Sequence, residues 1–208
     1  MPEPRTGRIL ILPVLAWLAT LPIASESARA ASATIVALGA SNTEGMKLST
    51  AEAYPAQLEQ ILRAKGLDVS VINAGVSGDT SEGMLNRLGS SVPDGTRLVI
   101  LQPGSNDGRG GRRQGGRIVD PGQSAANLDA VITQLQARGI AVAVFNGLGG
   151  AAREAAMRHH AIFLGQFSAG IPASARQPDG QHLTAEGYGM VAQRIAPKIG
   201  AMLGRSGR

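Results

Sequence analysis

Residues 35–45 read IVALGASNTEG and combine a short apolar run with a polar turn, a pattern that indicates the fold class. Four apolar residues lead into Gly39, and the chain then turns into small polar residues that include one serine, Ser41. Short apolar runs that end in glycine are typical of buried strands, and serine is common in the turns that follow them. Serine is also the nucleophile of many hydrolases. Local sequence therefore leaves two interpretations of Ser41 open, a turn residue and a displayed nucleophile.

Similar apolar runs recur along the chain and alternate with amphipathic segments. Strands are expected at residues 34–39, 68–75, 96–104, 140–147 and 161–165, and helices at 54–66, 80–91, 123–139, 151–161 and 184–203. Near-continuous apolar strands that are separated by helices indicate a parallel sheet covered on both faces. We therefore predict an α/β protein, a three-layer α/β/α sandwich around a mostly parallel sheet of about five strands.

Local signals also predict how two of these helices behave. Thr80 or Ser81 is expected to cap the helix at 80–91, because hydroxyl side chains accept hydrogen bonds from the free amides of a first helical turn. The helix at 184–203 contains Pro197 and two early glycines, which are expected to weaken or kink it.

Composition places the chain among globular proteins. Its 208 residues suit one domain with a real core, with 43% hydrophobic and 17% charged residues. The formal net charge is +5, and four arginines fall within residues 109–117. No aromatic residue interleaves these arginines, which favours a solvated loop, and no nucleic-acid partner is expected. The chain has no cysteine, which excludes disulfides, thiol nucleophiles and cysteine-bound metals.

Residues 1–30 have the pattern of a secretory signal peptide. Two arginines precede an apolar stretch at 9–24, and ARA at 28–30 matches a small-residue cleavage site. An uncleaved membrane anchor is the alternative, but the stretch is short for a span and contains two prolines. We therefore expect cleavage after Ala30, one mature domain over residues 31–208, and a periplasmic or secreted protein without a stable membrane anchor.

The order of the predicted strands places several polar residues at one edge of the sheet. In a parallel α/β sheet the ligand site lies beyond the carboxyl ends of the strands. Ser41 follows the first strand, Gly75 and Gly78 the second, and Asn106 the third. The glycine amides and the Asn106 side chain are able to donate to a developing oxyanion, although each residue is also a common turn former.

A serine nucleophile needs a base that accepts its proton and a group that orients the base. Of the three histidines, His159 and His160 lie in a predicted helix, and we interpret them as surface or half-buried residues. His182 lies in the turn-rich loop QPDGQHLTAEG, three residues after Asp179. A carboxylate at this spacing can reach the Nδ1–H of the histidine and fix its tautomer. A loop that caps the following helix is the structural alternative.

Four blocks of the sequence resemble, in order, the four signature blocks of the SGNH (GDSL-type) hydrolases. The blocks are LGASNTEG, NAGVSGDTSEG, QPGSND and DGQHLTAEGY, and together they span about residues 35 to 190. The second block is most similar to the branch that contains thioesterase I, lysophospholipases and arylesterases. One such block would be a weak signal, whereas four in register are specific. The resemblance implies the flavodoxin-like SGNH hydrolase fold for residues 31–208.

The resemblance also implies a function and a set of site residues. Ser41 matches the nucleophile, His182 the base and Asp179 the orienting acid. The Gly78 main chain and the Asn106 side chain match oxyanion donors that act beside the Ser41 amide. An exported esterase or thioesterase of this kind forms an acyl-enzyme on a small-molecule ester or thioester and needs no metal or organic cofactor. The alternatives are a carbohydrate O-acetylesterase or acetyltransferase, and a non-catalytic binding module on a degenerate hydrolase scaffold.

One position departs from the family pattern. The first block of the family normally reads Gly-Asp-Ser-Leu, whereas residues 39–42 of this chain read Gly-Ala-Ser-Asn. Ala40 cannot supply the carboxylate that usually bonds to nearby backbone amides, and its loss costs about 1 kcal/mol or more if those amides stay unpaired. All three triad positions remain, so we expect an active enzyme with altered support of the nucleophile loop.

Overall fold

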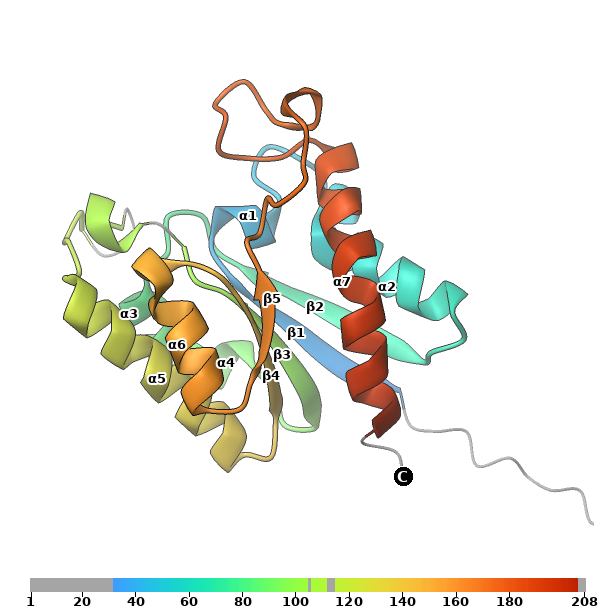
Figure 1. The fold of residues 1–208 in the computed structure, drawn as a ribbon, viewed down its shortest axis with the longest axis horizontal. Helices are drawn as coiled ribbons and strands as arrows, with labels where there is room; N and C mark the ends of the chain where they lie inside the picture. Colours follow the sequence, from blue (N-terminus) through green and yellow to red (C-terminus); the bar gives the residue numbers. More distant parts are fainter. Residues whose placement is uncertain (1–31, 105, 112–114, 206–208) are drawn as a thin grey trace, which may run out of the picture.

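The structure is a computed structural model that describes residues 32–104, 106–111 and 115–205, and its centre is a five-stranded parallel sheet. The strands are β1 (Ala33–Gly39), β2 (Val69–Gly75), β3 (Thr96–Gln102), β4 (Ala141–Phe145) and β5 (Ile162–Gly165). Their order is β2-β1-β3-β4-β5 (Figure 1), which is the order of flavodoxin-like doubly wound folds. The predicted three-layer sandwich is therefore confirmed, while the predicted signal peptide at 1–30 lies outside the described residues.

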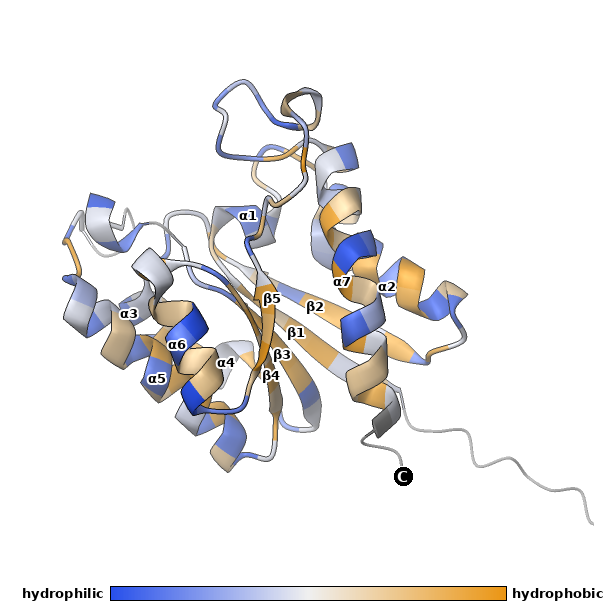
Figure 2. Ribbon diagram, in the orientation of Figure 1, coloured by the Kyte–Doolittle hydropathy of each residue, from blue (hydrophilic) through white to orange (hydrophobic). Residues whose placement is uncertain are grey.

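Helices cover both faces of this sheet (Figure 1). One face carries α2 (Tyr54–Ala64) and α7 (Ala185–Arg205), and the other carries α3 (Ser81–Asn86), α4 (Leu88–Ser91), α5 (Pro121–Ala137) and α6 (Ala151–Arg158). Along β1, Ile35 belongs to the core under α2 and α7, and Val36 to the core on the opposite face. Figure 2 shows the hydrophobic strands that result, as expected for strands buried on both faces.

The helix predicted at 80–91 is divided into two. Its start is as predicted, because the Thr80 hydroxyl accepts a hydrogen bond from the Gly83 amide at 3.1 Å. The chain then leaves helical geometry at Arg87, where φ is −99° and ψ is 8°, and α4 begins at the next residue. The Arg87 side chain contacts Asp79 and Gly39 outside both helices as well as Ser91 within α4, and a local sequence signal cannot report the first two contacts.

The last helix lies where it was predicted, and α7 continues through Pro197 to Arg205. Side chains around the proline, including Ile195 and Ile199, are almost fully buried against the sheet and α2, and this burial offsets the cost of the missing amide. The early glycines have a packing role instead. A Cβ atom on Gly187 would lie 2.3 Å from the Ala175 carbonyl oxygen, so only glycine fits this close approach.

The remaining predicted elements agree with the structure to within a few residues at their ends. Short 3₁₀ segments, not predicted from the sequence, lie at Thr50–Glu52, Asp107–Arg109, Leu148–Gly150 and Ala173–Ala175. A four-residue helix, α1 (Ser41–Glu44), was also not predicted. One residue, Ala40, separates it from the end of β1. Within the described ranges, no helix combines the length and apolar character that crossing a membrane requires.

Candidate active site

The carboxyl ends of β1, β2 and β3 carry the residues that were predicted to form a site. Ser41 is the first residue of α1, and Ala40 alone separates it from β1. Gly78 lies in the loop after β2, and Asn106 lies in the loop after β3. Because β1 pairs with β2 on one side and β3 on the other, the three ends are neighbours. Ser41, Gly78 and Asn106 accordingly line one cavity, as predicted from their places in the sequence.

His182 reaches this edge from the loop between β5 and α7, which rises above the sheet in Figure 1. Its Nε2 atom lies 2.8 Å from the Ser41 Oγ, although 141 residues separate the two in the sequence. On the other side of the ring, Nδ1 lies 2.9 Å from the Asp179 Oδ2. Ser41 and His182 are each 7% exposed, so both groups are shielded from water but reachable by a small molecule. His182 thus contacts both of the other predicted side chains, Ser41 and Asp179.

Hydrogen bonds to Asp179 set its charge and the tautomer of the histidine. The backbone amide of His182 donates to Oδ1 at 2.9 Å, the His182 ring contacts Oδ2, and the Gln181 amide donates to Oδ1 at 3.0 Å. These bonds hold the pKa of Asp179 well below its usual range. An ionised Asp179 accepts the Nδ1 hydrogen of His182, which leaves Nε2 to accept the hydrogen of the Ser41 hydroxyl.

The two other residues predicted as oxyanion donors line a cavity together with Ser41. Gly78 has a positive φ of 78°, a conformation that favours glycine because other residues place Cβ against the backbone. The Asn106 Nδ2 donates to the Asp79 carbonyl oxygen at 2.8 Å. That bond uses one of the two hydrogens on Nδ2 and fixes the amide, so the other hydrogen keeps a defined direction.

Gly75, considered as a further donor, has another role. Its amide donates to the Asn73 Oδ1 at 2.9 Å, and Gly75 is absent from the residues that line the cavities around Ser41. A Cβ atom at this position would lie 2.1 Å from the backbone nitrogen of Glu44. Gly75 therefore allows α1 to approach the end of β2 closely, which helps to place Ser41.

Two cavities meet at Ser41. The smaller has a volume of about 280 Å³ and is lined by Ala40, Ser41, Asn42, Gln102, Pro103, Gly104, Asn106, Asn146, Gly147, Leu148, Gln166, Ser168 and Gln181. The larger has a volume of about 440 Å³ and is lined by Ser41, Met46, Ser77, Gly78, Asn106, Arg109, Gly110, Gln181 and His182. The segments at 104–122 and 146–150 both contribute residues to these linings. Arg112 and Arg113 of the arginine-rich loop lie outside the described residues.

Gln102 is a part of this site that the sequence reading missed. It is the last residue of β3 and is 6% exposed. Its Oε1 lies 3.4 Å from the Ala40 amide nitrogen and 3.2 Å from the Thr43 Oγ1, and its Nε2 donates to the Pro103 carbonyl at 3.1 Å. Gln102 thus supplies an acceptor where Ala40 has no carboxylate. The available signal was a polar residue at the end of an otherwise apolar strand.

The other two histidines lie away from this edge, as predicted. His159 is half-buried at the end of α6, and its Nε2 lies 2.9 Å from the Asp129 Oδ1 on α5. His160 is exposed. Neither lines a cavity that contains Ser41.

Comparison with known sequences finds hydrolases. A model of the GDSL-like lipase/acylhydrolase family matches residues 37–190. Esterase TesA of Pseudomonas aeruginosa is 33% identical over 115 residues, which is 55% of this chain and 54% of that protein. Thioesterase 1/protease 1/lysophospholipase L1 of Escherichia coli (strain K12) is 34% identical over 113 residues, 51% of this chain and 53% of that protein. The chain spans about half the length of the curated relatives it matches.

Solved structures with the same fold are also esterases. The psychrotrophic esterase EstA from Pseudoalteromonas sp. superposes with a TM-score of 0.70 over 82% of this chain and 98% of that chain, at 22% identity. AlinE4, an SGNH-hydrolase family esterase, superposes with a TM-score of 0.61 over 83% of this chain and 97% of that chain, at 28% identity. The likeness to EstA supports the flavodoxin-like arrangement of the sheet.

Proposed function

This chain belongs to the GDSL-like lipase/acylhydrolase family, and on that premise we propose that it is a serine esterase or thioesterase acting on small-molecule acyl compounds. The observation that carries the proposal is the unbroken series of contacts from Ser41 through His182 to Asp179, at 2.8 Å and 2.9 Å. We assign these residues as nucleophile, general base and orienting acid. The Ser41 and Gly78 amides and the Asn106 side chain are assigned as oxyanion donors.

In the first half of the reaction, Ser41 attacks the carbonyl carbon of the substrate. His182 Nε2 accepts the hydroxyl proton as the new C–O bond forms, and Asp179 stabilises the imidazolium that results. The carbonyl electron pair moves onto oxygen, which accepts hydrogen bonds from the oxyanion donors. When the intermediate collapses, the bond to the alcohol or thiol breaks, and His182 returns the proton to that leaving group.

The proton that His182 returns to the leaving group indicates which of the two cavities holds each part of the substrate. The leaving group must lie next to His182, and His182 lines only the larger of the two cavities that meet at Ser41. We therefore place the alcohol or thiol in the larger cavity and the acyl group in the smaller one. In the second half of the reaction, water takes the place of the leaving group, His182 accepts its proton, and attack on the acyl-enzyme releases the acid and restores Ser41.

The test is covalent labelling combined with turnover. A fluorophosphonate probe is expected to label the protein once, and Ser41→Ala should abolish both labelling and hydrolysis of p-nitrophenyl esters. Ser174→Ala is the matched control, because Ser174 is exposed and lies in the same loop as His182. Asn106→Ala is expected to lower kcat by about 10²–10³-fold, the usual cost of one oxyanion donor. Labelling that persists in Ser41→Ala, or a wild-type protein that resists the probe, contradicts the proposal.

A substrate panel separates the activities that such a site supports. Turnover of p-nitrophenyl butyrate, longer esters and acyl thioesters as well as the acetate is expected for the proposed esterase or thioesterase. Turnover of the acetate alone would instead indicate an O-acetylesterase.

We also propose that residues 1–30 direct export to the periplasm or the medium. The support is the sequence of that segment, two arginines before an apolar stretch and ARA at its end. Intact mass of the protein from the periplasmic or culture fraction should match a chain that begins at Ala31. A chain that retains residues 1–30 in the membrane fraction would contradict this.

A further inference from the structure

Arg87 lies behind the nucleophile, at the break between α3 and α4, and takes no part in the chemistry described so far. We propose that Arg87, together with Asp79, is a positioning residue that sets the relative placement of the oxyanion donors. The inference rests on the proposed function, because it concerns the donors of the same site. It goes beyond that function by assigning a role to a buried ion pair that contacts neither the triad nor the substrate cavities.

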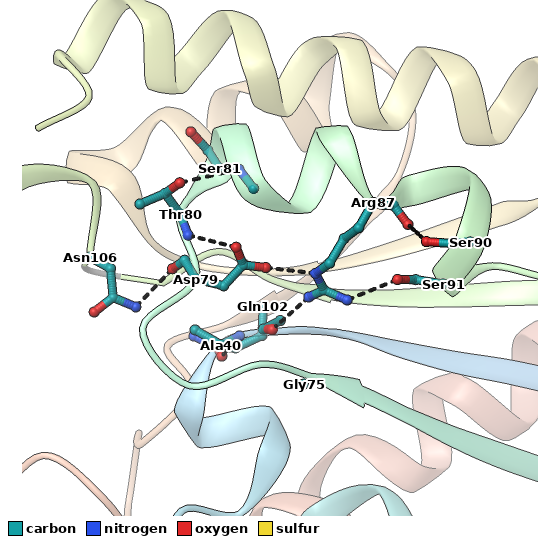
Figure 3. A network of polar contacts seen from close by, with 12 residues as sticks. Ala40, Gly75, Asp79, Thr80, Ser81, Arg87, Ser90, Ser91, Gln102 and Asn106 are labelled. Atoms are coloured by element: carbon teal, nitrogen blue, oxygen red, sulfur yellow. Dashed lines mark hydrogen bonds and ion pairs between the residues drawn. The ribbon is translucent and has the colours of Figure 1, made fainter. Parts of the chain in front are cut away.

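The guanidinium of Arg87 uses each of its nitrogens on a different partner (Figure 3). Nε donates to the Asp79 Oδ2 at 2.7 Å, and one terminal nitrogen donates to the Gly39 carbonyl oxygen at 3.0 Å. The other terminal nitrogen donates to the Ser91 Oγ at 3.0 Å. The Arg87 side chain is 20% exposed and the Asp79 side chain 2% exposed, so the pair is largely shielded from water.

Two of these partners are joined directly to the oxyanion donors. The Gly39 carbonyl ends β1, two residues before Ser41. Asp79 directly follows Gly78, and its own carbonyl oxygen accepts the 2.8 Å hydrogen bond from Asn106 Nδ2. One side chain thus links the segments that carry the Ser41 amide, the Gly78 amide and the Asn106 amide group.

The chemistry of arginine suits this role. Its planar guanidinium presents five hydrogen-bond donors in a fixed geometry, so it can hold a carboxylate and a carbonyl at a set separation. Lysine has one ammonium group on a flexible stem and cannot hold both partners in the same way. A buried ion pair contributes little net stability, because desolvation opposes the attraction. Geometry is therefore the property that this pair is suited to supply.

Asp79 also prevents the loop after β2 from moving independently. Its Oδ1 accepts a hydrogen bond from the Thr80 amide at 3.0 Å, at the start of α3. The same residue therefore joins the first turn of α3, the Gly78 peptide and the Asn106 side chain through three separate atoms. A shift of the Asp79 backbone would change the direction of both the Gly78 and the Asn106 donors, while leaving Ser41 and His182 in contact.

The test compares variants of Arg87 with a matched arginine elsewhere. Arg138 also bridges a backbone carbonyl and a carboxylate, those of Val92 at 2.8 Å and Asp94 at 3.1 Å, but it does so before the amino end of β3. Arg87→Met, Arg87→Lys and Arg138→Met are to be compared in kcat, KM and thermal unfolding. Arg87→Met combined with Asp79→Asn provides a variant in which no buried carboxylate is left unpaired, should the single variant fail to fold.

The readout specific to the oxyanion hole is the binding of a boronic acid. Boron accepts an electron pair from the Ser41 Oγ while His182 Nε2 accepts the hydroxyl proton, and a tetrahedral boronate anion forms. Its affinity therefore reports on the oxyanion donors, as that of a transition-state analogue does. Arg87→Met and the double variant are expected to lower kcat and boronate affinity in parallel, by about 10–100-fold, less than the loss of a whole donor. The KM of these two variants is expected to change less than about threefold. Arg87→Lys is expected to recover only part of the lost kcat. Arg138→Met is expected to change kcat less than about twofold.

Two results would overturn the proposal. The first is a folded Arg87→Met or double variant with reduced thermal stability but with kcat and boronate affinity near those of the wild type, which would make the pair merely structural. The second is a loss that simply multiplies with that of Asn106→Ala, since the part of the Arg87 effect that acts through the Asn106 donor must disappear when that donor is absent. Failure of the proposed function is separate, because the wild-type protein would then neither be labelled at Ser41 nor hydrolyse p-nitrophenyl esters.

Discussion

Replacing Gln102 with leucine tests how the nucleophile loop is supported in the absence of a carboxylate at residue 40. Gln102 Oε1 is the acceptor for the Ala40 amide at 3.4 Å and for the Thr43 hydroxyl at 3.2 Å, and its Nε2 donates to the Pro103 carbonyl at 3.1 Å. Leucine has a similar size but no polar atom. The substitution therefore removes three hydrogen bonds with little change in packing.

The expected cost follows from burial. Ala40 is 2% exposed and Thr43 is fully buried, so the two donors that lose their acceptor are poorly accessible to bulk water. A buried group left unpaired costs about 1–3 kcal/mol, and the Ala40 contact is long, so we take about 1 kcal/mol for each bond. Gln102→Leu should then lower the free energy of unfolding by about 3 kcal/mol, and the midpoint of thermal unfolding by roughly 6–12 °C.

Urea unfolding followed by circular dichroism measures this change. Gln134→Leu is the matched control, because Gln134 is exposed on α5 and the same substitution there should cost less than about 0.5 kcal/mol. In a Thr43→Val background the loss of unfolding free energy caused by Gln102→Leu should be about 1 kcal/mol smaller. Valine has no hydroxyl, so the substitution at Gln102 then leaves no buried hydroxyl unpaired at residue 43. A cost below about 1 kcal/mol, or one that the Thr43→Val background leaves unchanged, would refute the reasoning.

Three further predictions concern the base and the close approach of α1. Asp179→Asn should lower kcat by up to about 10⁴-fold while Ser41 remains present, because an amide no longer fixes the tautomer of His182; steady-state kinetics measures this. Hydrogen bonds from the His182 amide and ring lower the pKa of Asp179. The stability that these bonds contribute is therefore complete above the unfolded-state pKa of about 4 and is lost as the pH falls below it. The difference in urea midpoint between wild type and Asp179→Asn should narrow between pH 7 and about pH 3, and a constant difference would contradict this. Gly75→Ala should lower the free energy of unfolding by about 3 kcal/mol or more, because the new Cβ would lie 2.1 Å from the Glu44 nitrogen. Gly89→Ala is the control, because the space around Gly89 is open. Equal thermal midpoints for the two variants would contradict the close packing of α1 against Gly75.

The fold class and the predicted site follow from patterns that are local in the sequence. Near-continuous apolar runs that alternate with amphipathic segments predicted the parallel sheet, since burial of each element depends on its own residues. The residues assigned to the triad and to the oxyanion hole all lie in or beside four short blocks of the sequence. The four blocks that carry them resemble a family, and each block is only a few residues long.

Local patterns could not predict where helices break or bend. The region 80–91 was expected to be one helix, but it divides at Arg87, whose side chain is bound to Asp79, Gly39 and Ser91. α7 runs through Pro197, and side chains on either side of the proline are buried against the sheet and α2. Contacts from other elements add to the intrinsic preference of the local chain at both places, and the local sequence does not report them.

The sequence therefore predicts the helices and strands and the kinds of side chain that follow each strand. The pairing of the strands in the folded protein determines which of these strand ends are neighbours. The order β2-β1-β3 brings Ser41, Gly78 and Asn106 together, and it also brings Gln102 to Ala40 across 62 residues of sequence. Periodicity reports only whether a residue is buried, whereas its partner depends on how the strands pair. For this reason Ala40 stood out in the sequence as a loss, and only the structure revealed that Gln102 places an acceptor beside the Ala40 amide and the Thr43 hydroxyl.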